Sequence, residues 1–212
     1  MEIGAGAGGI LKPFKDKKNQ VWGLDLDSEY INFGKNQGIP LKVGTVNELE
    51  KLNEKPDLVI YSHVLEHILN PYEELTELRK HLKESSLVYI EVPGVKNLIK
   101  SYNQDFLRYL QNAHVYHFSL TTLRNITKKA GYDLVYGNEV INSIFKIGEV
   151  SNKFQNDYDE AITFLKNLER KRKNPFNLLR LRNSIFNSFV FVTKKTGTFE
   201  IARKIYHFIK YH

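Results

Sequence analysis

The chain has 212 residues, of which 42% are hydrophobic and 26% are charged, a composition typical of a globular protein with one sizeable core. It contains no cysteine, which excludes disulfides, thiolate metal sites and thiol nucleophiles, and we assign no metal ligand from the sequence. Neither a secretory signal nor an apolar run of membrane-spanning length is present, so we expect a cytoplasmic protein.

The net charge of +7 is distributed unevenly along the chain. Residues 151–212 carry 13 Lys and Arg against 5 Asp and Glu, and residues 1–150 carry 18 against 19. A nearly neutral body argues against nucleic-acid binding, and we expect none. The basic tail is compatible with an anionic membrane surface, an acidic partner, or only a solvated face.

A glycine-rich segment stands at the amino end of the chain. Gly4, Gly6 and Gly9 fit the spacing of a nucleotide-binding loop, with Glu2 before it and Ala5 within it. Glycines let the backbone turn sharply and let a ligand approach the main chain. A strand must feed such a loop and only residues 1–3 precede it, so we expect an incomplete first strand and a chain truncated at its amino end.

Strand and helix patterns alternate after this loop. The predicted strands cover 20–25, 40–43, 57–61, 87–92, 132–136 and 144–147, and the predicted helices cover 10–15, 28–35, 71–83, 98–111, 119–130 and parts of 158–212. This alternation predicts an α/β fold, a doubly wound and mostly parallel sheet with helices on both faces. We expect a domain over 1–149 and a basic helical C-terminal extension over 150–212.

Four segments then support a family resemblance. They are Glu-Ile-Gly-Ala-Gly-Ala-Gly at 2–8, Gly-Leu-Asp-Leu-Asp-Ser at 23–28, Pro-Asp-Leu-Val-Ile-Tyr-Ser-His-Val-Leu-Glu-His at 56–67 and Tyr-Ile-Glu-Val-Pro-Gly at 89–94. Their order and spacing resemble the class I S-adenosylmethionine-dependent methyltransferases, in particular the branch with a Leu-Glu-His signature. The resemblance covers about residues 2–149 and implies a Rossmann-like fold, methyltransferase activity and S-adenosylmethionine as cofactor.

The cofactor residues follow partly from spacing and partly from this resemblance. Asp25 lies 21 positions after Gly4, close to the interval of roughly 20 residues at which an acid reaches the ribose of a bound nucleoside. Helix capping, the alternative role, suits Asp27 or Ser28 better. The resemblance implies that Leu26 packs on the adenine and that the turn at Thr45 and Val46 meets its edge, although the family often has Asp where this chain has Thr45.

The first residues predicted to face the substrate come directly after the fourth strand of the family fold. The resemblance implies that Ser62 and His63 border the methionine part of the cofactor, and His67 is one helical turn after His63. His67 is a candidate general base. His117 and Tyr116, in a His-rich segment, are candidates to contact the acceptor, with packing beneath the helix at 119–130 as the alternative for His117.

The sequence therefore predicts an enzyme that methylates an oxygen of a small molecule or sugar. Two alternatives stay open at this stage: an NAD(P)-dependent oxidoreductase, and a truncated, non-catalytic interaction domain. The basic tail is expected to bind a membrane surface, to form a lid, or to support self-association.

Overall fold

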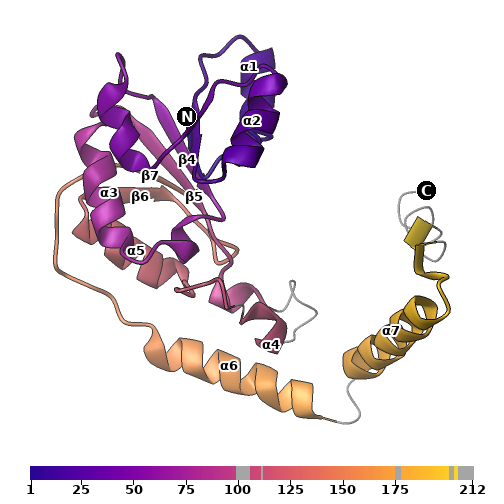
Figure 1. The fold of residues 1–212 in the computed structure, drawn as a ribbon. Helices are drawn as coiled ribbons and strands as arrows, with labels where there is room; N and C mark the ends of the chain where they lie inside the picture. The colour runs from indigo at the N-terminus through magenta and orange to yellow at the C-terminus, as the bar shows by residue number, and fades with distance from the viewer. Residues whose placement is uncertain (99–105, 111, 175–177, 201–202, 205–212) are drawn as a thin grey trace.

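A computed structural model describes the chain except for residues 99–105, 111, 175–177, 201–202 and 205–212 (Figure 1). Its centre is a seven-stranded sheet with the order β3-β2-β1-β4-β5-β7-β6. The first five strands are parallel, and β7 runs antiparallel to β5 and β6. The strands are β1 Glu2–Ile3, β2 Gly23–Asp25, β3 Leu41–Val43, β4 Leu58–Ser62, β5 Leu87–Glu91, β6 Tyr132–Tyr136 and β7 Asn142–Ile147.

Helices connect the strands and follow the last of them. The α-helices are α1 Leu11–Asp16, α2 Ser28–Asn36, α3 Pro71–Lys80, α4 Phe106–Tyr109, α5 Leu120–Lys129, α6 Tyr158–Lys173 and α7 Leu178–Lys195, and the 3-10 helices are η1 Val46–Lys51, η2 Leu65–His67 and η3 Val95–Asn97. Side chains cap several helices: Asn70 accepts from the third residue of α3, and Ser119 and Thr122 form a capping box at α5.

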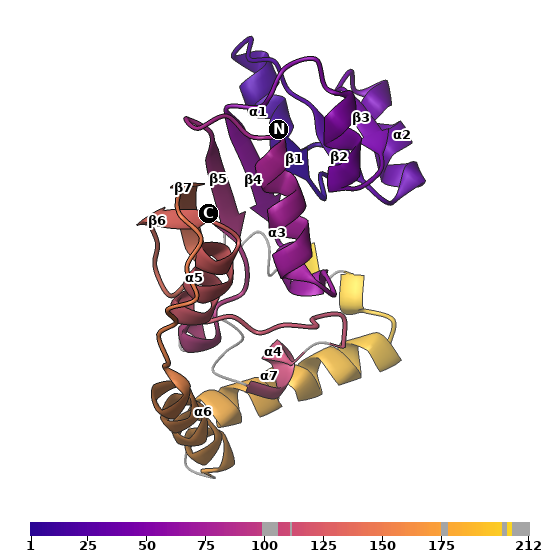
Figure 2. The same cartoon turned by 90° about the vertical axis from the view of Figure 1, so that its left-hand side faces the viewer.

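Apolar side chains cover both faces of the sheet, which confirms the predicted α/β fold. Figure 2 shows α3 and α5 in front of the sheet. Leu75, Leu78 and Leu123 of these helices are fully buried in the larger core cluster. On the other face, Leu11 of α1 and Ile31 of α2 belong to a smaller cluster.

The first strand lies in the middle of the sheet. Glu2 pairs with Gly23 of β2 on one side and with Ile60 of β4 on the other. Because β1 supplies only two residues, β2 begins at Gly23, three residues later than the predicted start. Similarly, α3 ends at Lys80, before the predicted end. The backbone N–H of His81 donates to the carbonyl groups of Leu78 and Arg79 and closes the last turn. Of the helix predicted over 98–111, the structure describes α4, and most of the rest lies outside the described residues.

Helix α6 packs on the segments that follow β5. Leu168 of α6 is 2% exposed and belongs to a third apolar cluster with Val95, Leu98 and Tyr109. Lys96 of η3 lies 3.0 Å from carboxylate oxygens of both Asp157 and Glu160, at the start of α6. Figure 1 shows α7 beyond α6 and apart from the sheet. The predicted helix after Gly197 lies mostly outside the described residues.

Candidate functional site

The order of the strands places a candidate binding edge above β1 and β4. From β1 the chain builds β2 and β3 on one side, and β4 and β5 on the other. In open α/β sheets, ligands bind at the carboxyl ends of the strands where this reversal occurs. The glycine loop after β1 and the ends of β2, β4 and β5 all meet at this edge.

The glycine loop turns tightly and leaves the space beside Gly6 unoccupied. Gly4 has φ +70°, and a Cβ atom there would lie 2.2 Å from Cγ2 of Val64, so the loop after β4 approaches closely. Gly6 has φ +50° and open space where its Cβ would be. Ala5 donates its N–H to the Leu24 carbonyl at 2.8 Å, which ties the loop to β2. A ligand can therefore reach the main chain at Gly6.

Asp25 links the end of β2 to this loop. One carboxylate oxygen accepts the N–H of Gly6 at 2.7 Å, and the other accepts the N–H of Asp27 at 2.8 Å. Asp27 caps α2 by accepting from Glu29 and Tyr30, which confirms its predicted capping role. The Asp25 carboxylate is thus held against the loop, and each oxygen retains a lone pair for a ligand hydroxyl.

The residues expected around the adenine lie on both sides of the ends of β2 and β3. Leu26 is 74% exposed beside Asp25, so its side chain is accessible to a ligand there. Thr45 is exposed at the start of η1. The Val46 side chain is 3% exposed in the core, so Val46 offers a ligand only its backbone.

Glu2 is a buried carboxyl at the base of the glycine loop. Its side chain is 2% exposed, and Oε2 has no hydrogen-bond partner among the residues that the structure describes. Burial raises the pKa of Glu2 to about 7, and the negative charge of Asp25 contributes to the increase. The loop is therefore built over a carboxyl group whose charged form is destabilised.

The end of β4 carries Ser62 and His63 next to β5. Ser62 donates its hydroxyl to Glu91 at 3.1 Å, and the His63 N–H donates to the Glu91 carbonyl at 2.8 Å. His63 has φ +56°, a left-handed conformation that costs energy in a residue with a Cβ and often occurs at functional sites. Its ring nitrogens lie 3.5 Å from Glu66 Oε1 and 3.7 Å from Glu91 Oε1.

A cavity of about 260 Å³ opens beside this turn. His63, Glu91, Val92, Pro93, Gly94, Asn97 and Val140 line it. A larger cavity of about 610 Å³ lies at the opposite edge, among residues such as Trp22 and Asp57 that precede β2 and β4. Because ligands in this type of sheet bind at the carboxyl ends of strands, the smaller cavity is the candidate site.

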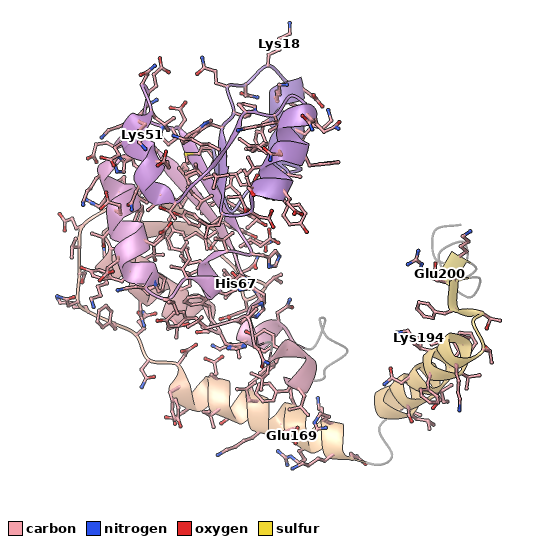
Figure 3. The ribbon with its side chains drawn as sticks, viewed as in Figure 1. Lys18, Lys51, His67, Glu169, Lys194 and Glu200 are labelled. Carbon is pink, nitrogen blue, oxygen red and sulfur yellow. The ribbon has the colours of Figure 1, made fainter. Side chains whose placement is uncertain are left out.

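Glu66, His67 and His114 form a cluster next to His63, which lines this cavity (Figure 3 labels His67). Glu66 is 1% exposed, and neither of its carboxylate oxygens has a hydrogen-bond partner among the described residues. His67 Nε2 lies 3.8 Å from Glu66 Oε1, while Nδ1 contacts the Ala113 carbonyl at 2.8 Å. Burial lowers the pKa of His114, which favours its neutral form.

His117 and Tyr116 point to different neighbours. The His117 ring lies edge-on to Tyr109 of α4 with 4.8 Å between centroids, and burial lowers the pKa of His117. Tyr116 donates its hydroxyl to the Leu69 carbonyl at 3.0 Å. His67 ends η2, five positions after the end of β4.

The structure adds three residues to which the sequence reading gave no role: Glu66, Glu91 and His114. Glu66 lies within the Leu-Glu-His signature and His114 within the His-rich segment, so the signal was present in both cases. Only the fold brings them together, because the N–H groups of Val115 and Tyr116 donate to the Glu66 carbonyl at 2.9 and 3.2 Å.

Comparisons with known proteins identify a family for this chain and solved structures that share its fold. Residues 1–136 match a family model described as a methyltransferase domain. An S-adenosylmethionine-dependent methyltransferase from Archaeoglobus fulgidus is 21% identical, with a TM-score of 0.53 over 81% of this chain and 78% of that chain. One from Clostridium acetobutylicum is 13% identical, with a TM-score of 0.55 over 69% and 82%.

A third solved structure contains a product of the cofactor. Magnesium protoporphyrin IX methyltransferase from Synechocystis, with bound S-adenosylhomocysteine, is 15% identical, with a TM-score of 0.51 over 71% of this chain and 73% of that chain. No curated protein matches this chain. At these identities the solved structures show the shared fold.

Proposed function

The chain belongs to the S-adenosylmethionine-dependent methyltransferases, and from this premise we propose that it transfers the methyl group of S-adenosylmethionine to an oxygen of a small molecule or sugar. The family assignment removes the nicotinamide-dependent oxidoreductase that the sequence alone left open. We propose residues 1–149 as the catalytic unit and residues 150–212 as its extension.

The contact between Asp25 and Gly6 is the observation that carries the cofactor site. A carboxylate that accepts a loop N–H at 2.7 Å is held where it can also accept the ribose hydroxyls of a nucleoside. We place the adenine between Leu26 and the Thr45–Val46 turn, and the methionine part between Gly4, Ala5, Gly6, Glu2 and the pair Ser62 and His63. The methyl group then points toward the cavity beside β5.

Methyl transfer is an in-line displacement at the methyl carbon. The bond between carbon and sulfur breaks, its electron pair stays on sulfur, and a lone pair of the acceptor oxygen forms the new bond. The enzyme contributes alignment and exclusion of water. A hydroxyl acceptor must also lose a proton, and we propose that His67 receives it on Nε2, because Nδ1 is occupied by the Ala113 carbonyl.

The cofactor site is tested with two matched variants, Asp25→Asn and Asp27→Asn, in calorimetric titrations with S-adenosylhomocysteine. Each removes one charge from the same turn. A charge-assisted hydrogen bond contributes about 1.5–3 kcal/mol, so Asp25→Asn should weaken binding about 10- to 100-fold. Asp27→Asn retains a capping side chain and should change binding less than about threefold. Unchanged affinity in Asp25→Asn contradicts the site.

The proton acceptor is tested by measuring S-adenosylhomocysteine release with a panel of phenols, alcohols and sugars. For an oxygen acceptor that the wild type methylates, His67→Ala should lower kcat about 10²- to 10⁴-fold. His117→Ala tests the second predicted histidine in the same assay. His81→Ala, on a residue that contacts Glu77 of α3, is the control and should retain its rate. An unchanged rate in both His67→Ala and His117→Ala contradicts the histidine role.

For the extension, we propose binding to an anionic membrane surface. Exposed apolar residues recur on α7 at intervals of three and four: Leu178, Leu181, Ile185, Phe189 and Val192. The helix contains no acidic residue and ends in Lys194 and Lys195, and the last turn of α6 is also basic. Such a helix lies in the membrane interface. Among the described residues, no helix has the length and apolarity needed to cross a bilayer.

Vesicle co-sedimentation tests this proposal. Wild type should bind vesicles that contain phosphatidylserine and not vesicles of phosphatidylcholine alone, and Phe189→Asp should reduce binding. Concentration-dependent dimerisation without vesicle binding contradicts the membrane proposal and indicates that α7 contacts a second copy of the chain. The cytoplasmic location remains a prediction.

A further inference from the structure

We infer that Glu66, His67 and His114 form a binding site for a divalent transition-metal cation, of which Zn²⁺ is the best match. The three side chains come from η2 and from the loop before α5, two segments 46 residues apart at the His67 and Ala113 contact. The cation site itself is independent of the proposed function. Only the chemical role given to the cation below rests on that function.

The ligand atoms are already close together. One atom from each residue lies within 4.8 Å of the other two, and Glu66 Oε1 is 3.8 Å from His67 Nε2. Ligands at 2.0–2.2 Å from a tetrahedral Zn²⁺ are about 3.4 Å apart. Small side-chain rotations therefore close the cluster on a cation. Two imidazoles and one carboxylate form a typical zinc set and leave a fourth position open.

The carboxylate of Glu66 supports a positive ligand. It is 1% exposed, and both oxygens are unpartnered among the residues that the structure describes. His63 Nδ1 at 3.5 Å and His67 Nε2 at 3.8 Å approach Oε1 but do not form hydrogen bonds with it. An uncompensated buried charge is costly. A cation bound between these groups would give the buried Glu66 oxygens the partner that they lack among the described residues.

The surrounding contacts orient His67 and His114 as ligands. The Ala113 carbonyl lies 2.8 Å from His67 Nδ1, so Nδ1 carries the proton and Nε2 presents its lone pair toward Glu66. A backbone carbonyl on the second ring nitrogen is the usual support of a metal-binding histidine. The Glu66 carbonyl accepts from Val115 and Tyr116, which holds the loop with His114 against η2.

The cation would lie next to the proposed acceptor cavity. His63, which lines that cavity, is 3.5 Å from Glu66 Oε1. A hydroxyl bound at the open position loses its proton more readily, because the cation stabilises the alkoxide. In the loaded enzyme His67 therefore acts through the cation and the proton passes to water, whereas in the metal-free enzyme His67 accepts the proton itself.

The test uses the full chain after treatment with a chelator. Zn²⁺ is titrated by calorimetry, and Co²⁺ binding is followed by its visible absorption. We expect one equivalent of either metal, tetrahedral Co²⁺ bands, and affinity at least tenfold weaker in His114→Ala and in Glu66→Gln. His81→Ala, away from the cluster, should bind like the wild type. Binding of S-adenosylhomocysteine by each variant shows that it is folded.

Two results overturn the inference. One is the absence of stoichiometric metal binding by a wild-type protein that binds S-adenosylhomocysteine. The other is wild-type metal affinity in both His114→Ala and Glu66→Gln. Neither result affects the proposed methyl transfer, which the Asp25 variants test separately. If Asp25→Asn binds the cofactor normally while metal binding holds, the cofactor site is wrong and the metal site stands.

Discussion

Glu2→Gln tests whether the base of the glycine loop holds a destabilised carboxyl group. The pKa of Glu2 is about 7 in the folded protein, against an ordinary value of 4.5, because burial penalises the charged form. Between these two pH values, the folded state binds more protons than the unfolded state. The contribution of Glu2 to stability is therefore complete below pH 4.5 and is lost as the pH rises through 7.

The two pKa values set the size of the effect. They differ by 2.5, and at 1.36 kcal/mol for each pH unit the ionised carboxyl destabilises the fold by about 3 kcal/mol above pH 7. Glutamine has a similar shape and no charge. Glu2→Gln should therefore be more stable than the wild type by about 1 kcal/mol at pH 5 and about 3 kcal/mol at pH 8.

Urea denaturation followed by circular dichroism measures the difference at pH 5, 6, 7 and 8. Glu50→Gln, a change at an exposed carboxyl group, is the control and should alter stability by less than about 0.5 kcal/mol at each pH. A Glu2→Gln difference that stays constant with pH, or that reverses at pH 8, would refute the reasoning. If Glu2 serves the cofactor as proposed, the stabilised variant also binds S-adenosylhomocysteine more weakly.

Two further predictions concern the loop and the extension. Gly4→Ala should destabilise the protein by about 2 kcal/mol and weaken cofactor binding, because the φ of Gly4 is +70° and the new Cβ would meet Val64. Gly9→Ala is the control and should leave stability unchanged, because a Cβ at Gly9 meets nothing within 4 Å. Equal losses of stability in the two variants would contradict this prediction. Leu168→Ala should speed hydrogen exchange in α6, because the smaller side chain leaves a cavity against Leu98 and Tyr109. Cofactor affinity should not change. Unchanged hydrogen exchange would contradict the packing of α6 on these residues.

Much of the fold follows from local signals in the sequence. The apolar run of β4 and the capped, amphipathic pattern of α3 predicted their elements to within a few residues. Asp27 or Ser28 was expected to cap the helix pattern that follows, and in the structure Asp27 caps α2. The start of β2 was placed wrongly because strand length depends on the partner, and β1 pairs no residue before Gly23. That information is not local.

The site was less accessible to sequence reasoning for a similar reason. Asp25 and the glycine loop are linked by a spacing that one βαβ unit imposes, so their contact was predictable. His114 and Glu66 are 48 positions apart, and no periodicity relates them. The contact between Ala113 and His67 that unites them depends on how the loop before α5 returns to β4.

Glu2 and Glu66 are two buried carboxyl groups near the candidate site, and they share two features. Both residues are at most 2% exposed, and both have a carboxyl oxygen without a hydrogen-bond partner among the described residues. Glu2 is part of β1, and Glu66 follows the neighbouring strand β4. At Glu2, where burial raises the pKa, an uncharged side chain of similar shape would stabilise the empty protein. S-adenosylmethionine carries positive ammonium and sulfonium groups, and a divalent cation is positive as well. On the two proposals made above, a positive ligand would lie beside each carboxyl group, and ligand binding would offset the cost of burying an unpartnered polar side chain.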